Sequence, residues 1–193
     1  MKLPRIPVPR RDRSGGWDLG EAKTLQHDLR ARVETRDRLN KDVQRLAGAD
    51  VSYDRGGTVL FAAVVVLDTE TLETVETATA VGRARFPYIP GYLSFRESPA
   101  VVEAFTRLRR RPDLLMVDGH GLAHPRSFGI ASHLGVLLDL PTIGVAKSVL
   151  VGEAGDPGPR RGSTAPLVVH GKRAAVVLRT RTAVAPVYVS IGH

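Results

Sequence analysis

The chain has 193 residues, with 28 Lys and Arg side chains against 20 Asp and Glu, which leaves a formal net charge of +8. This length suits one domain with its own core, and the absence of cysteine excludes disulfides, thiolate zinc sites and a cysteine nucleophile. No apolar run approaches the roughly 20 residues of a membrane-spanning helix, and no secretory signal is readable, so we predict a cytoplasmic protein that does not enter a membrane.

The predicted elements begin after a flexible arm. Residues 1–16 contain several Pro, Gly and Ser residues, and we expect a single folded domain over residues 17–193. Helical spacing of Leu25, Leu29 and Val33 predicts a helix over residues 18–39. Three strands are then predicted, at residues 46–53, 59–68 and 74–86. Short turns join them, which is typical of an antiparallel meander.

The second half alternates helices and strands. Residues 87–97 are predicted to be irregular, followed by a helix that starts at Pro99. Further elements are a strand at 114–117, a helix at 127–138, a strand at 141–146, a loop at 152–165, and closing strands at 168–169, 174–178 and 187–191. A strand-helix-strand order implies a parallel pair with a right-handed crossover. We therefore predict an α/β protein with a mixed sheet, helices on both faces, and a ribonuclease H-like topology.

Charge is unevenly distributed along the chain. Residues 1–45 carry 12 basic and 7 acidic side chains, residues 46–156 carry 10 and 13, and residues 157–193 carry 6 and none. Two basic ends around an acidic middle fit a protein that binds a polyanion and holds a metal ion at its centre. The alternative is an Arg-rich surface with no such partner, and charge alone favours nucleic acid only slightly.

Three acidic residues stand where chemistry could occur. Asp50 interrupts an apolar stretch, Asp118 follows a predicted buried strand, and Glu97 precedes a predicted helix. Because the carboxyl ends of parallel strands form sites in open sheets, Asp118 and Lys147 should lie close together. A cluster of carboxylates suits Mg²⁺, which binds oxygen ligands, and two such ions can clamp a phosphodiester.

Each of these residues also has a structural interpretation. Glu97 alone is more simply a charge at a helix N-terminus, Asp118 a turn residue and Lys147 a surface lysine. Asp50 is harder to explain in this way, because burying an unpaired carboxylate is costly. The histidines show no convincing zinc spacing, since glycine and proline around His120 and His124 argue against a helical metal site.

Four segments together resemble one known family. These are LAGADVSY (46–53), FPYIPGYLSFRE (86–97), VDGHGLAHPRSFGIASHLGVLLDLPTIGVAKS (117–148) and APVYVSIGH (185–193). They closely resemble endonuclease V, the deoxyinosine 3′ endonuclease of DNA repair. The resemblance implies a ribonuclease H-like fold and Mg²⁺-dependent hydrolysis of the second phosphodiester bond 3′ to hypoxanthine, with Mn²⁺ as a substitute.

The same resemblance implies roles for individual residues. Asp50, Glu97 and Asp118 would be the catalytic, metal-binding carboxylates, and Lys147 would lie near the scissile phosphate. Tyr88, held between Pro87 and Pro90, would be the wedge that fills the space left by the extruded lesion. The lesion pocket would be built from Gly91, Leu93, Gly119, Gly121, His124, Gly129 and Ile130. A tight pocket with glycines could exclude the exocyclic amine of guanine.

The resemblance has one departure. Family members usually continue past the final Gly-His with a helical segment that carries another histidine, whereas this sequence stops at His193. One alternative to a deoxyinosine endonuclease is therefore a lesion-binding module with impaired catalysis. The resemblance also implies a second alternative, a ribonuclease specific for inosine, since some relatives act on inosine in single-stranded RNA. The expected partner is inosine-containing DNA, or RNA, and the expected state is a monomer.

Overall fold

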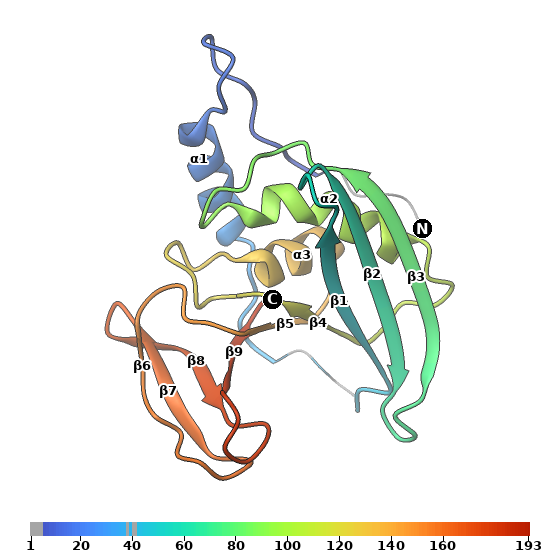
Figure 1. Ribbon diagram of the computed structural model, residues 1–193, viewed down its shortest axis with the longest axis vertical. Helices are drawn as coiled ribbons and strands as arrows, with labels where there is room; N and C mark the ends of the chain where they lie inside the picture. The colour runs from blue at the N-terminus through green and yellow to red at the C-terminus, as the bar shows by residue number, and fades with distance from the viewer. Residues whose placement is uncertain (1–5, 38, 40–41) are drawn as a thin grey trace.

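One mixed β-sheet organises the computed structural model, which describes residues 6–37, 39 and 42–193 (Figure 1). Within this part of the chain the strand order is β3-β2-β1-β4-β5-β9-β8-β7-β6. The strands are β1 Arg45–Tyr53, β2 Val59–Asp68, β3 Thr74–Arg83, β4 Leu114–Asp118, β5 Thr142–Ala146, β6 Glu153–Ala154, β7 Thr164–Val169, β8 Lys172–Leu178 and β9 Val187–Ile191. The helices are α1 Leu19–Arg30, α2 Leu93–Thr106 and α3 Ile130–Leu138.

Strand directions confirm the predicted fold class. β1, β2 and β3 form an antiparallel meander, and β4 and β5 add to β1 as parallel strands. β9 and β8 then continue the sheet in antiparallel fashion. The β-branched runs of these strands explain their positions, since such residues pack well on a pleated, largely buried surface. The short strand β6 is an addition inside the segment predicted as a loop.

We predicted helices on both faces of the sheet, but the helices of the described residues cover only one face. α2 and α3 pack together on one face, where Phe105 and Leu134 share a core cluster with Leu115 of β4. Side chains alternate between the two faces of a strand, so every second residue points away from this core. Phe61 and Val81, on the opposite face, are accordingly 45% and 62% exposed. Within the described residues, the helices thus form a layer on one side only.

The first helix is shorter than predicted. Asp18 caps α1 by accepting a 2.8 Å hydrogen bond from the Glu21 backbone N–H, as N-cap residues do. The helix ends at Arg30, with Ala31 as its C-cap, and not at residue 39. Its buried Leu29 packs against Phe128 and Val136, so α1 lies on the outside of the helical layer. Residue 38, near the end of the predicted helix, lies outside the described residues, as do residues 40 and 41.

The second helix starts six residues before the predicted start at Pro99. α2 begins at Leu93 and contains Pro99 in its interior. Proline lacks the N–H that would bond four residues back, but a helix tolerates this loss where packing is strong. Phe95, Val102 and Phe105 of α2 are buried and supply that packing. As a result, Glu97 lies within a helix and faces inward, whereas the sequence suggested a position before the helix.

The third helix begins at Ile130, three residues later than predicted, because Ser127 adopts a left-handed conformation with φ of +48°. Before α1, Arg11 and Trp17 form an isolated β-bridge, and Trp17 packs on Phe86 with ring centroids 4.9 Å apart. The predicted flexibility of residues 1–16 stays a prediction, and residues 1–5 lie outside the described residues. Among the helices of the described chain, none has the length and apolar character to cross a membrane.

Candidate active site

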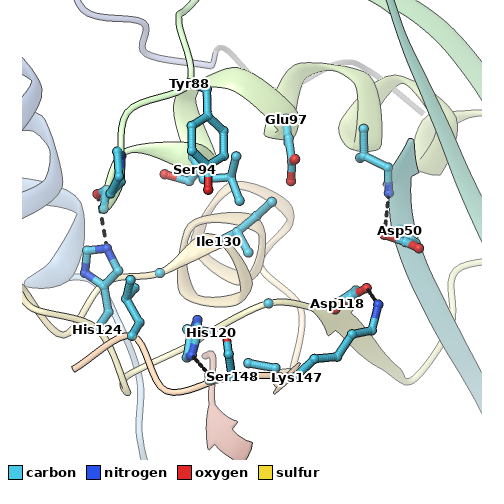
Figure 2. Close-up of a pocket in the computed structure, with 18 residues that line it drawn as sticks. Asp50, Tyr88, Ser94, Glu97, Asp118, His120, His124, Ile130, Lys147 and Ser148 are labelled. Atoms are coloured by element: carbon cyan, nitrogen blue, oxygen red, sulfur yellow. Dashed lines mark hydrogen bonds and ion pairs between the residues drawn. The ribbon is translucent and has the colours of Figure 1, made fainter. Parts of the chain in front are cut away.

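A pocket of about 360 Å³ lies at the carboxyl ends of the parallel strands. Ala49 of β1 pairs with Val117 of β4, so the next residues, Asp50 and Asp118, reach the same edge of the sheet. Lys147 directly follows β5, and α2 brings Glu97 over the same edge. Figure 2 shows Asp50, Asp118 and Lys147 along one side of this pocket and Glu97 above them. Topology thus gathers four charged residues that are far apart in sequence.

Glu97 has the most perturbed environment of these residues. Its side chain is buried, and burial raises its pKa to about 7. The negative charges of Asp50 and Asp118 act in the same direction, while a hydrogen bond from the Tyr53 hydroxyl and the charge of Arg96 act against it. A buried carboxyl group that shares a pocket with two other carboxylates is a common sign of a functional site.

Tyr53 was not among the residues predicted for the site. It lies at the end of β1, three residues after Asp50, and donates a hydrogen bond to Glu97 Oε1. The Arg96 guanidinium carbon lies 5.0 Å from the centre of the Tyr53 ring. Burial and the nearby Glu97 raise the pKa of Tyr53, so this hydroxyl keeps its proton and orients the carboxyl group. In the sequence, its position three residues after Asp50 was the one feature that could have indicated a role for Tyr53 at the site.

Lys147 pairs directly with Asp118. Its Nζ donates to Asp118 Oδ2, and this hydrogen bond raises the pKa of Lys147. The lysine side chain is 78% exposed and that of Asp118 is 28% exposed, so solvent and ligands reach both groups. Asp50 Oδ1 in turn accepts a 2.7 Å hydrogen bond from the Val51 backbone N–H. These contacts hold the carboxylates at the edge of the pocket.

The donor set fits a hard divalent cation. Three carboxylates face one cavity, and the repulsion of Glu97 by the other two is the kind of interaction that a cation relieves. In the described residues, however, no three Asp, Glu or His side chains are close enough to share one ion. Each carboxylate instead has a protein partner, namely Val51, Tyr53 or Lys147. The oxygen chemistry therefore suits Mg²⁺, and the metal site stays a proposal.

The other half of the pocket is apolar and glycine-rich. It is lined by Tyr88, Pro90, Gly91, Leu93, Gly119, His120, His124, Gly129, Ile130, Ser148 and Leu150. Tyr88 stands at the rim with 68% of its surface exposed, in the upper part of Figure 2. The pocket brings together all the residues predicted for the site except Gly121. His120, Ser148 and Leu150 are additional lining residues, and His120 bonds the Ser148 carbonyl at 3.0 Å.

Gly121 lies behind the pocket and does not line it. A Cβ atom at this position would be only 2.0 Å from the Ile191 carbonyl oxygen of β9. Its N–H donates a 2.9 Å hydrogen bond to Ser190 Oγ. Glycine is therefore required here for close packing of the loop on the sheet, which in turn places His120 at the pocket.

Comparison with known proteins identifies the family. The family model for endonuclease V matches residues 27–193. An endonuclease V from Rhodospirillum centenum is 54% identical over 180 residues, which cover 91% of this chain and 74% of that protein. An endonuclease V from Roseiflexus castenholzii is 53% identical over 186 residues, which cover 96% of this chain and 82% of that protein. The chain belongs to the endonuclease V family.

Solved structures of endonuclease V agree with this assignment. The crystal structure of the enzyme from Streptomyces avermitilis superimposes with a TM-score of 0.85 at 46% identity, covering 97% of this chain and 82% of that one. A Ciona intestinalis endonuclease V, crystallised with 24-mer DNA containing an inosine followed by a ribo-adenosine, superimposes with a TM-score of 0.77 at 25% identity. That match covers 91% of this chain and 83% of that one. As an endonuclease V, this protein is a nuclease.

Proposed function

We propose that this endonuclease V recognises deoxyinosine in DNA and hydrolyses the second phosphodiester bond on its 3′ side, with Mg²⁺ as cofactor. The observation that carries the proposal is a single pocket with an apolar, glycine-rich half and a half that contains three carboxylates. The first half suits a flat base and the second suits a phosphodiester. The Ciona intestinalis relative, crystallised with inosine-containing DNA, supports the same ligand.

Base recognition would begin with extrusion of the lesion from the duplex. Unpairing and unstacking a base costs a few kcal/mol, and a mismatched inosine costs least. Tyr88 is exposed at the rim between two prolines, so its ring can enter the vacated space without a large loss of conformational entropy. Ile130 and Leu93 offer apolar contacts to the extruded base, while the glycines allow the backbone to approach its edge.

Phosphodiester hydrolysis would use the charged half of the pocket. Asp50, Glu97 and Asp118 would hold Mg²⁺, which supplies charge stabilisation to the phosphate oxygens and lowers the pKa of a bound water. A cation also favours the ionised form of Glu97, whose pKa is otherwise raised by burial and by its acidic neighbours. The exposed ammonium group of Lys147 can move from Asp118 to a phosphate oxygen. Mn²⁺ accepts similar oxygen ligands and should substitute.

A cleavage assay tests the proposal. A duplex with one deoxyinosine, labelled at the 5′ end of that strand, is incubated with the protein and Mg²⁺, and the products are sized at single-nucleotide resolution. We expect one product that extends one nucleotide beyond the lesion. Controls are the same duplex with deoxyadenosine, the same reaction with EDTA, and an Asp50→Asn variant, none of which should give this product.

Two outcomes would overturn the proposal. One is an absence of cleavage at enzyme excess with both Mg²⁺ and Mn²⁺. If inosine-specific binding persists in that case, the protein is a lesion-binding module. The other is a base-free strand that breaks only in alkali, since this product indicates base release and not phosphodiester hydrolysis.

An RNA substrate is a second candidate. The DNA bound by the Ciona intestinalis relative carries a ribo-adenosine directly after the inosine. Parallel reactions with all-DNA, single-ribonucleotide and all-RNA strands of one sequence would decide between the two. We expect cleavage of the DNA strand; cleavage of the RNA strand alone would identify a ribonuclease.

A further inference from the structure

The Gly91 carbonyl group is the acceptor in an unusually dense set of hydrogen bonds. Gln26 Nε2 of α1 donates to it at 2.9 Å, and Arg126 Nη2 donates at 2.6 Å. His124 Nε2 is 3.1 Å from the same oxygen, as the dashed line in Figure 2 marks. Gly91 itself has φ of +80°, a conformation that suits glycine. Three side chains from two separate parts of the chain thus converge on one backbone atom.

These three side chains also fix one another. Arg126 Nε donates to Gln26 Oε1, so the amide of Gln26 uses both its ends. The Arg126 backbone N–H donates a 3.2 Å hydrogen bond to His124 Nδ1, so Nδ1 is the acceptor and Nε2 carries the proton given to Gly91. Burial lowers the pKa of His124 to about 4, which agrees with this neutral tautomer. Gln26 and His124 are only 1% and 3% exposed.

The segment held in this way contains the predicted wedge and one wall of the pocket. Residues 88–92 connect Tyr88 at the rim to the start of α2. The Arg126 guanidinium lies 4.2 Å from the centre of the Tyr92 ring, at the end of the segment. Ile89 and Tyr92 pack against the cluster that contains Ala22 of α1. The segment therefore rests on α1 through apolar contacts and is oriented by polar ones.

We propose that Gln26, together with Arg126, is a positioning residue that holds residues 88–92 in the conformation that binds the lesion. Gln26 lies 65 positions before Gly91 and outside every motif of the family resemblance. It touches none of the three carboxylates, so it acts through the substrate-binding segment. The inference rests on the function proposed above.

This role predicts a specific kinetic pattern. A segment that is correctly placed only part of the time lowers apparent affinity in proportion to that fraction. Replacing Gln26 by Leu preserves bulk and removes both hydrogen bonds of the amide. We expect KM for the deoxyinosine duplex to rise about tenfold while kcat stays within about twofold, since the carboxylates are undisturbed. In hydrogen exchange, the amides of residues 88–92 should exchange several-fold faster than in the wild type.

Two further variants separate positioning from simple stability. Leu29→Ala removes a buried contact of α1 that lies away from Gly91. It should lower the midpoint of thermal unfolding while leaving KM and the exchange of residues 88–92 at wild-type values. Gln26→Glu keeps the acceptor for Arg126 but loses the N–H given to Gly91, and it should raise KM as Gln26→Leu does.

The possible results divide clearly. Wild-type KM in Gln26→Leu, wild-type KM in Gln26→Glu, or the same changes in Leu29→Ala as in Gln26→Leu would each overturn the inference. If the wild-type protein does not cleave the deoxyinosine duplex, the proposed function fails. The exchange rates then still decide whether Gln26 positions the segment, because they need no substrate.

Discussion

His133 of α3 is a fully buried imidazole whose ionisation should make the protein sensitive to acid. It is 0% exposed and lies between Phe95 and Phe128, with ring centroids 5.4 and 5.3 Å away. Neither ring nitrogen has a hydrogen-bond partner in the described part of the chain. Burial therefore lowers the pKa of His133 from 6.5 to about 3. Nothing in the proposed mechanism uses this group, so its effect should appear in stability alone.

The magnitude follows from proton linkage. Between pH 6.5 and about 3 the unfolded chain binds a proton at this histidine and the folded chain does not. Stability therefore falls as the pH falls through this window. At pH 5, protonation of this histidine stabilises the unfolded state by about 2 kcal/mol, because the pH is then about 1.5 units below the unfolded pKa of 6.5. A His133→Leu variant, with an apolar side chain of similar size, should lack this loss.

Guanidinium unfolding of both proteins at pH 7.5 and pH 5.0, followed by far-UV circular dichroism, measures the effect. We expect the wild type to lose about 2 kcal/mol more than His133→Leu between these two pH values. All other titrating groups are shared and cancel in the comparison. His27→Gln removes an exposed imidazole of α1 and serves as the control, and it should keep the acid-induced loss that His133→Leu lacks. Parallel losses in wild type and His133→Leu would refute the reasoning.

Three other predictions concern the carboxyl pocket, a glycine and the core. Burial raises the pKa of Glu97 from 4.5 to about 7, so the folded chain binds a proton here that the unfolded chain has lost. In EDTA, the unfolding free energy of the wild type relative to Glu97→Gln should therefore fall by about 3 kcal/mol at most as pH rises through this range. Gly121→Ala places a methyl group 2.0 Å from a backbone oxygen and should lower the free energy of unfolding by about 3 kcal/mol or more. At Gly48 an added Cβ would meet no atom within 4 Å, so Gly48→Ala should change the free energy of unfolding by less than about 0.5 kcal/mol. Phe105→Ala should lower unfolding free energy by about 3–5 kcal/mol in urea titrations, and Phe61→Ala, at a position 45% exposed, by much less.

The strands were predictable because their pattern is local. β2 runs from Val59 to Asp68 as predicted, since a continuous β-branched run records burial directly in the sequence. β9 likewise spans Val187–Ile191 as predicted. The proximity of Asp118 and Lys147 was predictable too, because the order of strand, helix and strand makes β4 and β5 parallel and both residues lie at the carboxyl ends of these strands. These inferences need only neighbouring residues and general chain topology.

Helix boundaries depended on contacts that local sequence does not contain. Pro99 is a good helix start by local rules, but the buried contacts of Phe95 and Phe105 stabilise a helix that begins before it. α1 ends at Arg30 although Val33 continues its apolar spacing. The expectation of helices on both faces failed for a similar reason, because an apolar strand does not reveal which of its faces a helix will cover.

The sequence by itself determined the mixed sheet and, through its family resemblance, most of the residues that line the pocket and the chemistry those residues can perform. Tertiary structure decided how they are held: Tyr53 orients Glu97, and Gln26 meets Arg126 across 100 positions of the chain. Gly121, predicted to line the pocket, instead packs against β9 behind it. The physical reason is that residue type sets what a side chain can bind, whereas burial, pKa and hydrogen-bond partners arise only from neighbours that folding brings into contact.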